Sequence, residues 1–140
     1  QFSHPLKHLH AVALIGTLLY TAGASAGTIT AYSALEEDEI KEYIAAAKKD
    51  YEVYCVQCHG LRRNGTGVNV PYMSVKPRDH TDAKAMGDLP DDQIFRAIKE
   101  GGLANNKSVL MPSFGAVLSD DKITDMVAYL RQVCKCGPSR

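Results

Sequence analysis

Two cysteines and a histidine lie close together in the segment Cys55-Val56-Gln57-Cys58-His59. The C-x-x-C-H pattern is the attachment signal for c-type haem. Two thiols at this spacing lie on one side of a helical turn, where each can form a thioether with one vinyl group of a porphyrin. The histidine that follows then offers Nε2 of a neutral imidazole to the iron as an axial ligand. The sequence therefore predicts covalent haem attachment at Cys55 and Cys58, with His59 bound to the metal.

A C-x-x-C pair also occurs in zinc sites and in thioredoxin-like redox proteins. Zinc needs about two further ligands at suitable spacing, and a thioredoxin-like motif lies next to a βαβ pattern. The sequence shows no βαβ pattern, and its other two cysteines, Cys134 and Cys136, form a C-x-C pair near the far end. Haem attachment is therefore favoured. For the C-x-C pair two interpretations stay open: Cys134 is simply buried on its helix, or the pair forms a disulfide, either within itself or to another chain.

A six-coordinate electron-transfer haem needs a second axial ligand, and methionine raises the reduction potential relative to histidine. The candidates are Met73, Met86, Met111 and Met126. Met126 falls on the apolar stripe of a predicted helix, where core packing explains it. Met111 lies in an extended segment next to Pro112, from which its thioether can be presented to the opposite side of the ring. Spacing therefore favours Met111 without excluding Met73 or Met86.

Three helices are predicted to position these residues, over residues 36–55, 90–100 and 119–133. Apolar residues recur at three- and four-residue steps in the first and third, where they predict two stripes that pack together. These stripes are Ile40, Tyr43, Ile44, Ala47, Tyr51 and Tyr54 in the first helix, and Ile123, Met126, Val127, Leu130 and Val133 in the third.

The helix ends have their own signals. The acidic run 36–39 suits a helix start, Pro90 suits a first turn, and Ser119 is an N-cap. Between His59 and Gly87, glycines and prolines punctuate a long segment of little periodicity, which is expected to wrap the haem.

The order of these segments resembles bacterial class I cytochrome c over about residues 38–133. The matching segments are C-V-Q-C-H-G, K-P-R-D-H-T-D, D-D-Q-I-F-R-A-I-K-E-G-G, L-M-P-S-F-G and L-S-D-D-K-I-T-D-M-V-A-Y-L-R. The resemblance implies an all-α fold, with few helices wrapped around one covalently bound haem c. It also implies Met111 as the sixth ligand, because Met111 matches the methionine of the family's M-P-x-aromatic-G segment.

Two further residues follow from the same resemblance. The family has a loop proline whose carbonyl accepts the Nδ1 proton of His59, which orients the ring and makes it a better donor. The K-P-R-D segment points to Pro77, with Pro71 as a competitor. Arg78 is expected to partner a haem propionate, with a purely surface role as the alternative.

The N-terminal segment 8–35 contains no Asp, Glu, Lys or Arg. One interpretation is a cleaved secretory signal, with Lys7 as its charged region and Ala24-Ser25-Ala26 as the cleavage site. The other is a transmembrane helix, because Leu9 to Ala31 is long enough to span the hydrocarbon. Since the segment belongs to the chain, we expect residues 1–35 to be a retained anchor and residues 36–140 to be the cytochrome c domain.

Charge gives the expected orientation and partners. Lys7 is the only Lys or Arg before the apolar run, which predicts a cytoplasmic N-terminus and a haem domain on the periplasmic side of a bacterial cytoplasmic membrane. Sixteen basic and sixteen acidic residues give a formal net charge of +0, so nucleic acid is not an expected partner.

The features together predict an electron carrier without a small-molecule substrate, in a respiratory or photosynthetic membrane complex with redox partner proteins. The alternatives are a soluble periplasmic carrier, if the signal is cleaved, and a haem sensor or peroxidase, which would need an open iron position.

Overall fold

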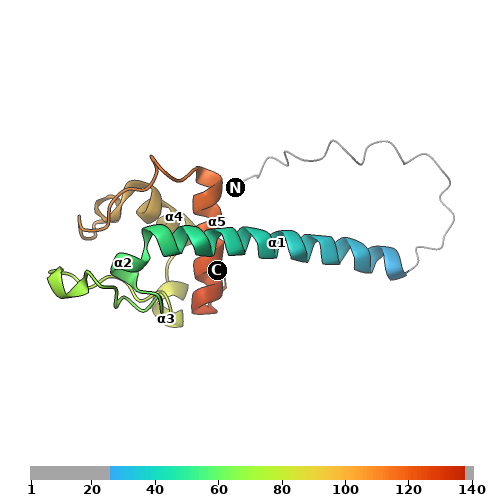
Figure 1. The fold of residues 1–140 in the computed structure, drawn as a ribbon, viewed down its shortest axis with the longest axis horizontal. Helices are drawn as coiled ribbons and strands as arrows, with labels where there is room; N and C mark the ends of the chain where they lie inside the picture. Colours follow the sequence, from blue (N-terminus) through green and yellow to red (C-terminus); the bar gives the residue numbers. More distant parts are fainter. Residues whose placement is uncertain (1–25, 138–140) are drawn as a thin grey trace. The chain divides into compact units, whose positions relative to one another are not determined.

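The computed structural model describes the backbone of residues 26–137 and the side chains of residues 37–137. The chain divides into two compact units, residues 1–38 and 39–140, and the second contains the predicted site. Within the described residues all regular elements are helical (Figure 1). They are α1 (Ala26–Tyr54), α2 (Val56–His59), η1 (Val70–Tyr72), α3 (Ala83–Gly87), α4 (Asp91–Glu100), η2 (Gly102–Asn105) and α5 (Asp120–Cys134). The predicted all-α class is confirmed.

Helix α1 begins ten residues before the acidic run that was expected to mark its start. After Gly27 there is no Gly or Pro to stop the helix before Tyr54, so the acids lie inside it. The predicted apolar stripe is buried only toward the C-terminal end, at Ala47 and Tyr51. Ile40 and Tyr43, which were expected to be part of the same contact, are 55% and 45% exposed.

Helix α5 contacts α1 through an aromatic pair and an ion pair. Figure 1 shows the two helices as ribbons. The rings of Tyr51 and Tyr129 lie edge to face with centroids 5.7 Å apart, and Lys122 Nζ lies 3.0 Å from a carboxylate oxygen of Asp50. The predicted contact between the two helices is therefore present, although Tyr129 lies off the expected stripe. The predicted cap is also present, because Ser119 Oγ accepts a hydrogen bond from the Lys122 amide at 3.3 Å.

The segment between α2 and α4 contains short helices that periodicity did not predict. Helix α3 is capped by Asp82, whose Oδ1 accepts a hydrogen bond from the Ala85 amide at 2.9 Å. An aspartate before a short run of Ala and Lys is a readable N-cap signal. The following helix, α4, starts after Pro90, with Asp91 and Asp92 in its first turn, as predicted.

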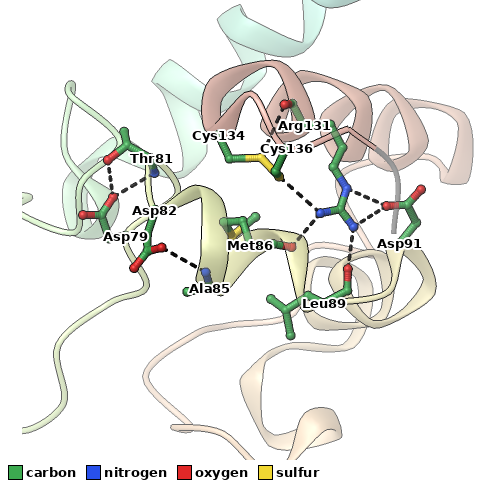
Figure 2. The surroundings of a disulfide bond; sticks show 10 residues. All are labelled: Asp79, Thr81, Asp82, Ala85, Met86, Leu89, Asp91, Arg131, Cys134 and Cys136. Atoms are coloured by element: carbon green, nitrogen blue, oxygen red, sulfur yellow. Dashed lines mark hydrogen bonds and ion pairs between the residues drawn. A yellow bond between two sulfur atoms is a disulfide. The ribbon is translucent and has the colours of Figure 1, made fainter. Parts of the chain in front are cut away.

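The C-terminal end of α5 is tied to α3 and α4 (Figure 2). Cys134 and Cys136 form a disulfide with each other, which decides between the two pairings left open by the sequence. Arg131 lies beside this disulfide, with Nη1 3.5 Å from Cys136 Sγ. Its guanidinium also donates to the carbonyls of Met86 and Leu89, at 2.6 and 2.5 Å.

The expected membrane span is largely outside this part of the chain. Leu9 to Ala31 falls mainly on residues that the structure does not describe. Among the helices of residues 26–137, none combines the length and the apolar character that a membrane crossing requires.

Candidate functional site

A cavity of about 420 Å³ lies between the helices of the second unit. Its wall is largely apolar and includes Ile94 and Ile98 of α4 and Leu130 of α5. All of the predicted site residues line this one cavity, although they come from three separate stretches of the sequence. They are Cys55, Cys58, His59, Pro77, Arg78 and Met111.

The two thiols are presented by a tight helical turn. Cys55 follows the end of α1 at Tyr54 and is the N-cap residue of α2, and its carbonyl accepts a hydrogen bond from the His59 amide at 2.9 Å. Both Cys55 and Cys58 are free and partly buried. Burial, with the nearby Asp50 and Cys58, raises the pKa of the Cys55 thiol to about 12, so it is a neutral thiol at neutral pH.

The imidazole of His59 is buried and held by one hydrogen bond. Its exposed fraction is 8%, and burial lowers its pKa, so the neutral ring is favoured. Its Nδ1 lies 3.0 Å from the carbonyl oxygen of Arg78. Because that oxygen can only accept, the proton lies on Nδ1 and the lone pair on Nε2 is left for a metal.

This hydrogen bond corrects the role predicted for Pro77. The acceptor is the carbonyl of the next residue, Arg78. The Pro77 carbonyl is directed toward Gly65 instead, since a Cβ added to Gly65 would lie 2.5 Å from it. Pro77 lines the cavity next to Arg78. The Arg78 side chain is exposed at the cavity, and its predicted propionate contact stays a prediction.

Glycines allow the loops to approach the site closely. The Gly67 amide donates to the Cys58 carbonyl at 3.0 Å, and a Cβ on Gly67 would lie 2.6 Å from that carbonyl. In another part of the lining, the Gly102 amide donates to the Met111 carbonyl at 2.9 Å. A Cβ on Gly102 would lie 3.0 Å from the Cβ of Met111. The segments carrying His59 and Met111 are therefore both fixed by main-chain contacts.

All four methionines that the sequence offered line the cavity. Met86 and Met126 are each 1% exposed and belong to the core, while Met111 is half-buried. A place in the cavity lining does not by itself distinguish Met111 from the other three methionines as an iron ligand.

Sequence reasoning missed the roles of His80, which contacts His59, and of Tyr51, which contacts His80. The ring of His80 stacks on the ring of His59, with centroids 4.2 Å apart and an angle of 16° between the planes. The Tyr51 hydroxyl lies 3.1 Å from Nδ1 of His80. His80 is in the K-P-R-D-H-T-D segment, but no spacing rule connects it to the C-x-x-C-H motif. Tyr51 was identified only as part of an apolar stripe.

The residues fit a covalently held haem. Two free thiols lie on one turn, a neutral imidazole has its Nε2 unprotonated, and an apolar cavity adjoins both. Among the side chains of residues 37–137, no group of three or more His, Cys, Asp or Glu is placed to hold a metal ion. The helical fold and this site define a c-type cytochrome domain.

Residues 42–130 match the family model described as "Cytochrome C oxidase, cbb3-type, subunit III", and the chain belongs to this family. No curated protein matches the chain significantly. Membership supports a c-type haem electron-transfer protein with covalently bound haem c, and an electron carrier rather than a catalytic enzyme.

Proposed function

We propose that the chain is a membrane-anchored electron-transfer subunit with a single haem c, held between His59 and Met111. The observation that carries this proposal is that Cys55, Cys58, His59 and Met111 line one cavity. When bound, haem supplies a one-electron couple between ferrous and ferric iron. No bond of a substrate is made or broken.

The chain's own residues hold and tune the group. Cys55 and Cys58 fix it through two thioethers, so it cannot dissociate. His59 would be one protein ligand to the iron, and its Nδ1 hydrogen bond to the Arg78 carbonyl would make it a stronger donor. Met111 would be the second ligand, and a methionine there would raise the reduction potential relative to a second histidine. The exposed Arg78 side chain would balance the charge of a propionate.

The ligand assignment can be tested by absorption spectroscopy. Oxidised wild-type protein should show the weak sulfur-to-iron charge-transfer band, and Met111→Ala should lose it. Met73→Ala is the matched control, because Met73 also lines the cavity and is partly exposed. A band that is absent from wild type, or that persists in Met111→Ala, contradicts the assignment. Rapid carbon monoxide binding by the reduced wild type would instead support a sensor or peroxidase.

Anchoring and location form the second part of the proposal. The uncharged segment 8–35 and Lys7 before it support a retained helix in the bacterial cytoplasmic membrane, with the haem domain on the periplasmic side. The partners are then subunits of a respiratory or photosynthetic complex and redox proteins that reach the haem edge.

Intact-mass measurement of the purified protein tests the anchor. A mass lacking residues 1–26 would contradict it and leave a soluble periplasmic carrier. Protein that retains these residues and needs detergent for extraction would support it, and the complex that co-purifies would identify the partners.

A further inference from the structure

The stacked pair His59 and His80 is buried on the cavity wall. The two rings lie 4.2 Å apart and within 16° of parallel, and the residues are 8% and 9% exposed. Only His59 belongs to the C-x-x-C-H motif. A second histidine in face-to-face contact with an axial ligand has no role in attaching haem, so its fixed position calls for another explanation.

His80 is held from both its main chain and its side chain. Its amide donates to the Arg63 carbonyl at 2.7 Å, and Nδ1 lies 3.1 Å from the Tyr51 hydroxyl. When this hydroxyl donates the bond, Nδ1 accepts it and the proton of the neutral His80 ring lies on Nε2. The Tyr51 ring also meets the His80 ring edge to face, with centroids 5.8 Å apart.

Tyr51 is itself fixed. It is 1% exposed, and its ring packs edge to face against Tyr129. The Arg63 guanidinium lies over both tyrosine rings, at 5.4 and 5.8 Å, and its Nε donates to the Tyr129 hydroxyl at 2.6 Å. Arg63 thus holds the His80 main chain through its carbonyl and covers Tyr51 with its side chain. The support behind His80 is a rigid cluster of α1, α5 and the loop.

The two contacts of the His59 ring restrain different motions. The hydrogen bond from Nδ1 to Arg78 fixes the direction of one ring atom but leaves the tilt of the ring about that bond free. The face contact with His80 restrains the plane of the ring. Because imidazole overlaps the iron d orbitals through its π system, this plane decides how an axial histidine splits their energies.

We propose that His80, held by Tyr51, is a positioning residue that sets the plane of the His59 ring and thereby the electronic structure of the iron that His59 binds. This inference rests on the proposed function, because it takes His59 as an axial ligand. It adds a supporting shell behind the ligand, in the way that residues behind metal-bound histidines orient them in other sites.

The test uses oxidised holoprotein and spectra that report ring orientation. The readouts are the g values in electron paramagnetic resonance and the paramagnetically shifted haem-methyl resonances. We expect His80→Ala to shift both, while the covalent haem mass and the sulfur-to-iron band stay as in wild type. His80→Phe keeps a flat ring against His59 and should restore most of the wild-type pattern. Tyr51→Phe keeps the packing but loses the hydroxyl, and should give a smaller shift than His80→Ala.

Val75→Ala is the matched control, because Val75 also lines the cavity and is 51% exposed. Its spectra should equal those of wild type. If His80→Ala folds and its spectra superimpose on wild type, the inference is overturned. If His80→Ala does not fold, a Tyr51→Phe spectrum identical to that of wild type overturns it. A wild type without low-spin histidine ligation overturns the proposed function and this inference with it, whereas low-spin wild type with unshifted variants overturns this inference alone.

Discussion

Arg131 of α5 forms an ion pair with Asp91 at the start of α4, with Nη2 2.6 Å from the carboxylate oxygen (Figure 2). The side chain of Arg131 is 7% exposed and that of Asp91 is 45% exposed. The same guanidinium donates to the carbonyls of Met86 and Leu89, two residues that line the cavity. One buried side chain therefore joins three segments around the candidate haem site.

Replacing Arg131 should destabilise the domain strongly. Arg131→Leu leaves two carbonyls and a carboxylate without their donor, and losing hydrogen bonds to a buried charge costs about 2–5 kcal/mol. Denaturant unfolding measures this loss. Lys84→Ala is the control, because the Lys84–Asp88 pair is 88% and 68% exposed and such solvent-screened pairs contribute little to stability. Equal stability of the two variants would show that the Arg131 contacts do not hold the fold.

The Cys134–Cys136 disulfide should contribute only modestly to stability. On the chain-entropy account the gain grows with the loop that is closed, and a bridge between residues two apart closes a very short one, for which about 1–2 kcal/mol is expected. Replacing both cysteines, each by Ala or by Ser, should lower the free energy of unfolding by about 1–2 kcal/mol.

Alkylation under denaturing conditions checks the bridge itself. Before reduction, holoprotein should carry no free thiol, because Cys55 and Cys58 are used for haem attachment and Cys134 and Cys136 form the disulfide. After reduction it should carry two free thiols. Two alkylated thiols without a reductant would contradict the disulfide.

Stability should fall as the pH decreases below the ordinary pKa of histidine, in part through His80. Burial, with the charges of His59 and Arg78, lowers the pKa of His80 well below its usual range. Below about pH 6.5 the unfolded chain protonates this residue and the folded chain does not, so stability rises with pH there and levels off above it. The contribution is at most about 1.4 kcal/mol per pH unit.

Urea unfolding of holoprotein at a series of pH values tests this dependence. His80→Phe should show a shallower fall than wild type, since His59 is unchanged in both. If the free energy of unfolding changed with pH equally in both proteins, the pKa of His80 would be the same in the folded and the unfolded chain, and His80 would be protonated in the folded chain at low pH.

The local signals in the sequence were sufficient to predict the Ser119 cap and the helical class. Ser119 and Cys55 act through neighbours within a few residues, so their surroundings could be predicted from spacing. The resemblance to a known family strengthened the prediction of Met111 as an iron ligand, which spacing alone favoured without excluding Met73 or Met86. The same resemblance misplaced one detail, because the sequence does not show which of two successive carbonyls, that of Pro77 or that of Arg78, faces His59.

Contacts between distant segments could not be predicted in this way. The stack of His80 on His59 and the bonds of Arg131 to the α3–α4 segment depend on how loops fold over the helices. An arginine in a helix predicts an exposed charge, and nothing in its spacing indicates that Arg131 is buried. The prediction that Ile40 and Tyr43 are buried was wrong for a related reason. An apolar stripe on a helix does not show how far along the helix the packing neighbour extends.

Gly67 is expected to be intolerant of a side chain for steric reasons alone. A Cβ there would lie 2.6 Å from the carbonyl of Cys58 and against that of Gln57, both main-chain groups of the helix that carries the attachment motif. Gly67→Ala should therefore push the loop away from α2 and cost about 1–3 kcal/mol, seen as a lower unfolding midpoint. Gly87→Ala is the matched control, since its Cβ would meet Cys136 Cβ at an ordinary 3.6 Å and alanine suits a helix. It should be as stable as wild type or slightly more so. Equal midpoints for the two variants would show that the loop carrying Gly67 does not press on α2.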